Sequence, residues 1–156
     1  MRLLRVVLGV SVLLGPVASQ PSKAGLSPCS LVTKAEVQEA AGAPAGEGSI
    51  NAHNKSVCDF KVGDAGSVGI MLTAKAPGDS AERTVAELKK RNITAQVTPG
   101  FGDSAYASSG DYGTQQLGVY KGSNHVIVTV LMFGAPEAKS KALAQAVMRK
   151  ALVRMQ

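Results

Sequence analysis

Hydrophobic residues recur at every second position along two neighbouring stretches, 57–62 and 68–74. A period of two residues is typical of a β-strand with one buried face. Because the stretch Gly63-Asp64-Ala65-Gly66 separates them, we expect the two strands to form a hairpin. The positions that this pattern predicts for one face are Cys58, Phe60, Val62, Val68, Ile70, Leu72 and Ala74.

A second series of strands follows in the second half of the chain. Short strands are predicted at 103–107 and at 115–119, and 93–97 is a candidate edge strand. The stretch 126–133 is strongly apolar and rich in β-branched residues, which is typical of a central strand. Glycine-rich turns separate these segments, so the second half also reads as antiparallel.

Three helices are predicted between and after the strands. The first is expected over 33–41 and the second over 79–91, each beginning at a pair of residues with capping-box spacing. The third opens near Pro136, where a missing N–H costs nothing, and runs toward the C-terminus. The capping pairs are Thr33 with Glu36 and Asp79 with Glu82.

The two halves of the chain resemble each other in their order of elements. Phe60-Lys61 corresponds to Tyr120-Lys121 at an offset of 60 residues, and Pro77 corresponds to Pro136 at an offset of 59. The helices are too short and alanine-rich to be stable without a sheet to cover. We therefore predict an α+β fold, an antiparallel sheet built from two strand–turn–strand–helix units with the helices packed mainly on one face. The alternative is chance similarity, because the shared residues are mostly glycine and proline.

Composition places this pattern in one exported domain. The chain has 156 residues, of which 45% are hydrophobic and 18% charged, values that fit a single globular domain. Residues 1–19 have the basic start, apolar run and small-residue end of a signal peptide, with cleavage expected between Ser19 and Gln20. An uncleaved anchor is the alternative. We expect a linker at 20–28, a domain at 29–156 and no transmembrane span after cleavage, hence a secreted, periplasmic or cell-envelope location.

The two cysteines, Cys29 and Cys58, lack the spacing of a redox pair. An even number of cysteines in an exported chain favours one structural disulfide. The alternative is a zinc site completed by His53 and His125, but these four residues lack compact ligand spacing. We therefore expect a disulfide, no metal site and no cofactor.

The net charge of the chain lies at its two ends. Residues 20–134 hold ten basic and ten acidic side chains, whereas 135–156 hold five basic residues against Glu137. The basic residues complement the C-terminal end of a helix dipole, or they form a contact surface for an anionic envelope polymer. Nucleic acid is not an expected partner of an exported chain without a binding motif. The five residues are Lys139, Lys141, Arg149, Lys150 and Arg154.

Motifs for catalysis are missing from the sequence. The chain contains no G-x-S-x-G, S-x-x-K or H-E-x-x-H pattern. The sheet is expected to use Phe60, Tyr120 and Phe133, which leaves three aromatic residues in the Gly/Asp-rich stretch 100–113. Loops with exposed aromatic residues are common contact surfaces, although packing at the sheet edge is the alternative for Phe101 and Tyr106. The candidate ligand loop comprises Phe101, Asp103, Tyr106, Asp111 and Tyr112.

Three short motifs carry a family resemblance. They are Cys29-Ser30-Leu31-Val32-Thr33-Lys34-Ala35-Glu36-Val37, Cys58-Asp59-Phe60 and Gly100-Phe101-Gly102-Asp103-Ser104-Ala105-Tyr106. The chain resembles the small exported domains of unknown function found among actinobacterial lipoproteins. The resemblance implies an α+β domain with a Cys29–Cys58 disulfide and no established catalytic activity, and it supplies no functional residues. The chain lacks the cysteine that many members carry at the cleavage site, so we expect no lipid anchor.

These observations predict an exported, non-enzymatic binding or interaction module of the bacterial cell envelope. Its expected partner is an unknown envelope protein or an anionic polymer. The alternative is a small hydrolase that acts on envelope polymer through Asp103 and Asp111.

Overall fold

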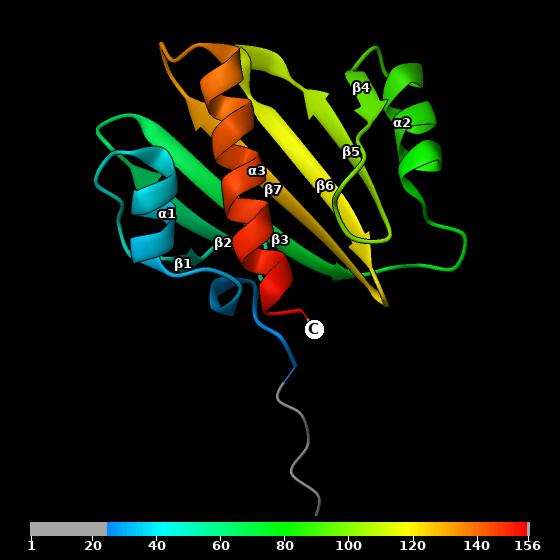
Figure 1. Cartoon of the computed structure of the whole chain (residues 1–156), viewed down its shortest axis with the longest axis horizontal. Helices are drawn as coiled ribbons and strands as arrows, with labels where there is room; N and C mark the ends of the chain where they lie inside the picture. The colour runs from blue at the N-terminus through cyan, green and yellow to red at the C-terminus, as the bar shows by residue number, and fades with distance from the viewer. Residues whose placement is uncertain (1–24, 156) are drawn as a thin grey trace, which may run out of the picture.

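The computed structural model describes residues 25–155, so the predicted signal peptide and most of the predicted linker lie outside the described residues. Within 25–155 the chain forms one seven-stranded sheet in which every neighbouring pair is antiparallel (Figure 1). The spatial order of the strands is β1-β2-β3-β7-β6-β5-β4. The strands are β1 (Ser49–Ile50), β2 (Val57–Val62), β3 (Gly66–Ala74), β4 (Thr94–Val97), β5 (Ser104–Ser109), β6 (Gln115–Lys121) and β7 (Asn124–Met132).

The helices are α1 (Lys34–Ala41), α2 (Ala81–Lys90) and α3 (Glu137–Val153), with short 3-10 turns η1 (Pro28–Ser30) and η2 (Asp111–Gly113). Both predicted units are therefore present, as β2-β3-α2 and β6-β7-α3. The two hairpins meet at the centre of the sheet, where β3 pairs with β7 along the full length of both strands. The α+β fold and the antiparallel sheet are confirmed.

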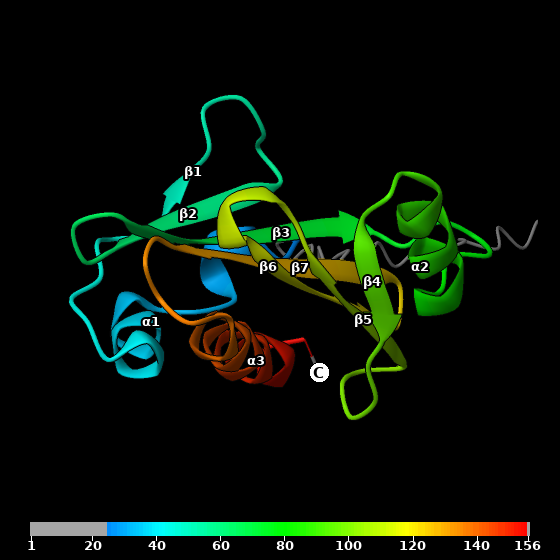
Figure 2. The same ribbon diagram turned by 90° about the horizontal axis from the view of Figure 1, so that it is seen from above.

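The main core lies between one face of the sheet and the helices α1 and α3 (Figure 2). Most inward side chains of β2, β3, β6 and β7 are almost fully inaccessible to solvent because the two helices and η1 cover them. The alternation that predicted the first hairpin is confirmed at Cys58, Phe60, Val62, Val68 and Ile70, all of which are buried. Leu72 is partly buried against the same core, whereas Ala74, at the end of β3, is exposed.

Helix α2 lies at the other end of the sheet and packs against the opposite face. Its buried residues Ala81 and Val85 pack with Tyr106 and Tyr120 in a second, smaller cluster. Side chains alternate along a strand, so Val119, which packs in the core under α3, and the next residue, Tyr120, point to opposite faces. Two helices thus cover one face and one helix covers part of the other.

Phe60 and Tyr120, which correspond in the sequence repeat, do not occupy equivalent positions in the structure. Phe60 faces the main core, whereas Tyr120 faces α2. The reason is turn length, because three residues join β2 to β3 and only two join β6 to β7. Val68 therefore pairs with Phe60, but its counterpart Val128 pairs with Leu117 rather than with Tyr120. The repeat conserves the order of elements, not the register of the outer strands.

Local capping follows the prediction at α1 and departs from it at α2. The Thr33 hydroxyl accepts a hydrogen bond from the Glu36 N–H, and the Glu36 carboxylate accepts one from the Thr33 N–H, which completes the predicted capping box. At α2 the N-cap is Ser80, one residue later than predicted. Asp79 instead accepts a hydrogen bond from the Ala76 N–H and closes the preceding turn.

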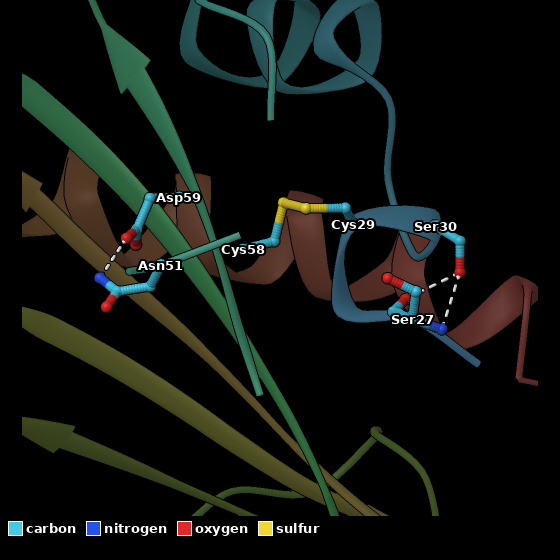
Figure 3. The surroundings of a disulfide bond; sticks show 6 residues. All are labelled: Ser27, Cys29, Ser30, Asn51, Cys58 and Asp59. Atoms are coloured by element: carbon cyan, nitrogen blue, oxygen red, sulfur yellow. Dashed lines mark hydrogen bonds between the residues drawn. A yellow bond between two sulfur atoms is a disulfide. The ribbon is translucent and has the colours of Figure 1, made fainter. Parts of the chain in front are cut away.

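The predicted disulfide between Cys29 and Cys58 is present, with a Cα–Cα distance of 5.1 Å (Figure 3). It ties η1 to β2, an inner strand of the sheet, and the bond uses both sulfur atoms that the zinc alternative required. Closing a loop of this length stabilises a fold by roughly 3 to 4 kcal/mol in the chain-entropy model. None of the helices in residues 25–155 combines the length and the apolar character that crossing a bilayer requires.

Candidate functional site

The five residues of the predicted ligand loop do not form one site. Phe101 is buried in the main core, where its ring lies 4.6 Å from the Arg149 guanidinium. Tyr106 is buried on the opposite face of the sheet, under α2. Both aromatic residues therefore pack against the sheet, which was the alternative interpretation for them.

Asp103 and Asp111 lie at opposite ends of β5. Asp103 precedes the strand and accepts a hydrogen bond of 2.7 Å from the Gly122 N–H, which closes the turn between β6 and β7. Asp111 follows the strand in η2. Eight residues of extended chain span roughly 25 Å, whereas the carboxylate pairs of glycosidases are about 5 to 9.5 Å apart. The structure therefore does not bring together the pair on which the hydrolase alternative depends.

Tyr112 is the aromatic residue of the predicted loop that stays exposed, with 86% of its surface accessible. Its backbone has φ of +58°, a left-handed conformation that costs a tyrosine roughly 1 to 2 kcal/mol. The Thr114 side chain holds the turn by donating a hydrogen bond to the Asp111 carbonyl. Tyr112 and the candidate residues Phe101 and Tyr106 thus occupy three different surroundings.

Most of the basic side chains of α3 and its C-terminus have partners within the chain. Lys141 pairs with Glu137 at 2.6 Å, Lys150 pairs with Glu39 at 3.1 Å, and Arg149 stacks on Phe101. Among residues 25–155, no acidic side chain pairs with Lys139. Of the basic residues that the sequence singled out as a surface for an anionic polymer, Arg149 and Lys150 thus connect α3 to other parts of the fold, whereas Lys141 pairs within the helix.

Arg154 makes the most extensive of these contacts. Its guanidinium donates to the Leu31 carbonyl at 3.1 Å and to the Glu36 carboxylate at 3.0 Å, joining the end of α3 to α1. Partial burial raises the pKa of Glu36, but the hydrogen bonds from Arg154 and Thr33 together lower that pKa below its usual range. The contact is a charge-assisted hydrogen bond with less than half of either side chain exposed.

A different surface stands out once the chain is folded. Among residues 25–155, α2 covers the sheet face opposite α1 and α3 at its β4 end only, and no helix lies over its β2, β3 and β7 part (Figure 2). The loop between β1 and β2 rises beside this part of the face (Figure 2). The face contains a hollow of about 260 Å³. We name this uncovered part of the sheet the open face. The residues that line its hollow are Val57, Asp59, Ser67, Gly69, Met71, Gln116, Ile127 and Thr129.

A row of polar side chains crosses the open face from strand to strand. Asp59 is the partner of Gly69, Gly69 of Thr129, and Thr129 of Gln116. The Gln116 amide donates to the Thr129 hydroxyl at 3.2 Å and accepts from Ser108 at 3.3 Å. These hydrogen bonds hold the Gln116 and Thr129 side chains in position at one end of the row.

An apolar row runs parallel to the polar one. Val57 pairs with Met71, and Met71 pairs with Ile127. Each of these three side chains is only half-buried, although each lies on a paired strand. Gly69 has no side chain, so nothing projects from this position in the middle of the face. A Cβ built there would lie 3.2 Å from Asp59 Oδ1. Half-buried aliphatic side chains around a hollow are typical of a binding surface.

Asp59 contributes the charge in the hollow. The Asn51 amide donates a hydrogen bond of 2.6 Å to its Oδ2 atom, which joins the β1–β2 loop to β2 (Figure 3). Within residues 25–155, Oδ1 accepts no hydrogen bond. One carboxylate oxygen is thus available to a donor on a ligand.

An aromatic cluster lies beside the open face, under the start of α2. The His125 ring stacks on Tyr120 with ring centroids 4.2 Å apart, and Tyr106 Oη lies 3.2 Å from His125 Nε2. Burial lowers the pKa of His125, and the negative charge of Asp79 opposes this effect only in part. Burial, and to a smaller degree Tyr120, raises the pKa of Tyr106. The His125 side chain is half-buried.

The open face offers aliphatic side chains, hydroxyl and amide groups and one carboxylate. Among residues 25–155, no three His, Cys, Asp or Glu side chains lie close enough to hold a metal ion. The sequence did contain a signal for this face, because Val57, Met71 and Ile127 are apolar at the strand positions that point away from the core. Apolar residues on both faces of a strand indicate a second contact surface.

Comparison with protein-family models, with curated proteins and with solved structures found no match for this chain. The resemblance to the exported domains of actinobacterial lipoproteins therefore stays a prediction.

Proposed function

We propose that the protein is an exported, non-enzymatic binding module of the bacterial cell envelope whose open face contacts a partner protein. The observation that carries the proposal is the open face itself. Three paired strands present half-buried aliphatic side chains beside an ordered polar row and a hollow of about 260 Å³. Leaving such side chains accessible costs hydrophobic stabilisation, which a partner would recover by covering them.

The chemistry of the face favours a protein over an anionic polymer. The charged residue that lines the hollow is an acid, Asp59, which would repel a polyanion. Its apolar residues are aliphatic, whereas sugar polymers are bound mostly against aromatic rings, and Tyr106 and Tyr120 are buried. Methionine adapts to partners of different shape, and Met71 lies at the centre of the apolar row.

The disulfide supports the exported location. Disulfides persist in oxidising compartments, and Cys29–Cys58 joins two parts of the fold that are distant in sequence. The hydrolase alternative receives no support, because its two carboxylates lie at opposite ends of β5.

Site-specific photo-crosslinking in the native envelope tests the proposal. A photoreactive phenylalanine replaces Ile127, or Ser67 if the first variant folds poorly, and adducts are identified by mass spectrometry. We expect one dominant protein adduct that disappears when Met71→Glu is added. The matched control carries the photoreactive residue at Val153, which is 66% exposed at the end of α3. The same adduct from Val153, or no protein adduct from either open-face position, would overturn the proposal.

A further inference from the structure

The open face limits what kind of segment can occupy it. We propose that the occupant is an amphipathic helix of the partner protein, lying across β2, β3 and β7 with a lysine or arginine against Asp59. This inference rests on the proposed function, because it names the partner's chemistry for the same surface.

The backbone of the open face excludes an added strand. A partner strand binds by hydrogen bonds to an unpaired sheet edge. Here β2 is paired with β1 and β3, and β3 and β7 are each paired on both sides. Their backbone groups are used within the sheet, so an occupant contacts this face through side chains. A helix presents side chains in all directions and suits such a surface.

The apolar row is long enough to contact one helix that lies across the strands. The three neighbouring strands β2, β3 and β7 span about 10 Å at the usual spacing of about 4.8 Å. Two turns of an α-helix rise about 11 Å. The same face already accepts a helix at its other end, where α2 packs on Tyr106 and Tyr120. The occupant would lie beside α2 on the part that α2 leaves free.

The side chains of the open face select an amphipathic helix with a basic residue. The apolar row of Val57, Met71 and Ile127 accepts the apolar stripe of the helix. Asp59 then lies beside that stripe, and its free Oδ1 accepts a hydrogen bond from a lysine or arginine. Because Gly69 has no side chain, Asp59 Oδ1 lies over its backbone, 3.2 Å from where a Cβ would be, near the middle of the open face.

Binding to designed peptides tests the inference without knowledge of the natural partner. The probe is a leucine–lysine peptide of about 20 residues, long enough to form an isolated amphipathic helix. A second peptide replaces lysine by glutamate, and a third has the first composition with two central prolines that break the helix. The protein has a formal net charge of +6, so general electrostatics repels the lysine peptide and favours the glutamate peptide. Preference for lysine would therefore report the acid on the open face.

We expect the lysine peptide to shift the amide resonances of Gly69 and Thr129 and to bind at least about tenfold more tightly than the other two peptides. Asp59→Asn should weaken its binding about tenfold, the loss typical of one charge-assisted hydrogen bond. The matched control is Asp64→Asn, which removes an exposed acid from the β2–β3 turn and should leave binding unchanged. Equal effects of the two substitutions, or equal binding of the proline peptide, would contradict the inference.

The two proposals fail in distinguishable ways. If Ile127 crosslinks a partner in the envelope but no helical peptide binds the open face, the protein-binding function stands and the helix inference is wrong. If neither experiment detects contact at the open face, both are wrong.

Discussion

The ring of Tyr106 occupies the space that a side chain at Gly118, its cross-strand partner, would fill. A Cβ built on Gly118 would overlap the ring atoms of Tyr106. The missing side chain lets the ring lie close to the sheet, where α2 covers it and His125 contacts its hydroxyl. This relationship holds α2 and the aromatic cluster beside the open face.

Replacing Gly118 by alanine should destabilise the protein by about 1 to 3 kcal/mol, because the added methyl forces the Tyr106 ring away from the sheet. Urea denaturation measures the loss, and exchange of the α2 amides with solvent should become faster. Gly110→Ala is the matched control, since a Cβ there would meet only Thr114 at 3.7 Å, an ordinary contact. A Gly118 variant as stable as the Gly110 variant would show that the ring is not held as described.

Reduction of the Cys29–Cys58 disulfide should lower the free energy of unfolding by roughly 3 to 4 kcal/mol, because the reduced unfolded chain regains the entropy of an open loop. The measurement compares urea midpoints with and without a reductant. The Cys29→Ala, Cys58→Ala double variant should match the reduced protein and not respond to the reductant. A reductant effect on the double variant would mean that the loss has another cause.

The stability of the protein should rise with pH on passing upward through the titration of His125. Burial lowers the pKa of His125 in the folded state, whereas the unfolded chain has the ordinary value of about 6.5. Between these two values the unfolded state binds more protons, so stability increases with pH and is lost on acidification. Thermal unfolding from about pH 5.5 to about pH 7.5 measures the slope in this window.

His125→Gln should flatten that slope, and His53→Gln, a substitution at an exposed histidine, is the matched control. A slope that is unchanged in the His125 variant would assign the pH dependence to other groups.

Arg154→Ala should destabilise the protein by about 1 to 2 kcal/mol, since it removes charge-assisted hydrogen bonds to Glu36 and to the Leu31 carbonyl. It should also raise the pKa of Glu36 toward its ordinary value, which an NMR titration of the carboxyl carbon detects. Lys139→Ala serves as the control and should change stability by less than about 0.5 kcal/mol, the usual range for an exposed residue. Equal effects of the two variants would mean that Arg154 adds nothing beyond surface charge.

Local sequence patterns predicted much of the fold. Alternation identified β2 and β3, and an apolar run rich in β-branched residues identified β7. The capping box of Thr33 with Glu36 identified the start of α1. Strand β1 was missed because its two residues, Ser49 and Ile50, are too few to show a period. Phe133 was wrongly assigned to the sheet, since β7 ends one residue earlier and Phe133 is 61% exposed.

The candidate site depended on information that local patterns do not contain. The basic residues at the C-terminus looked available because their acidic partners are remote in sequence, as for Arg154 and Glu36, which are 118 positions apart. The aromatic residues of 100–113 looked like one loop because the direction of each side chain relative to the sheet was unknown. Only the folded chain separates Phe101 from Tyr106.

The sequence by itself determined the class of the protein: an α+β domain with a pair of cysteines suited to one disulfide and strands whose inward residues are legible from their period. These features can be predicted locally because the steric contacts and hydrogen bonds that set them act between residues that are close in sequence. The tertiary structure decided which face each strand presents to which helix, because turn length sets the register of the next strand. It also decided that Val57, Met71 and Ile127 come together on an uncovered face, since strands that are distant in sequence become neighbours only when the sheet forms.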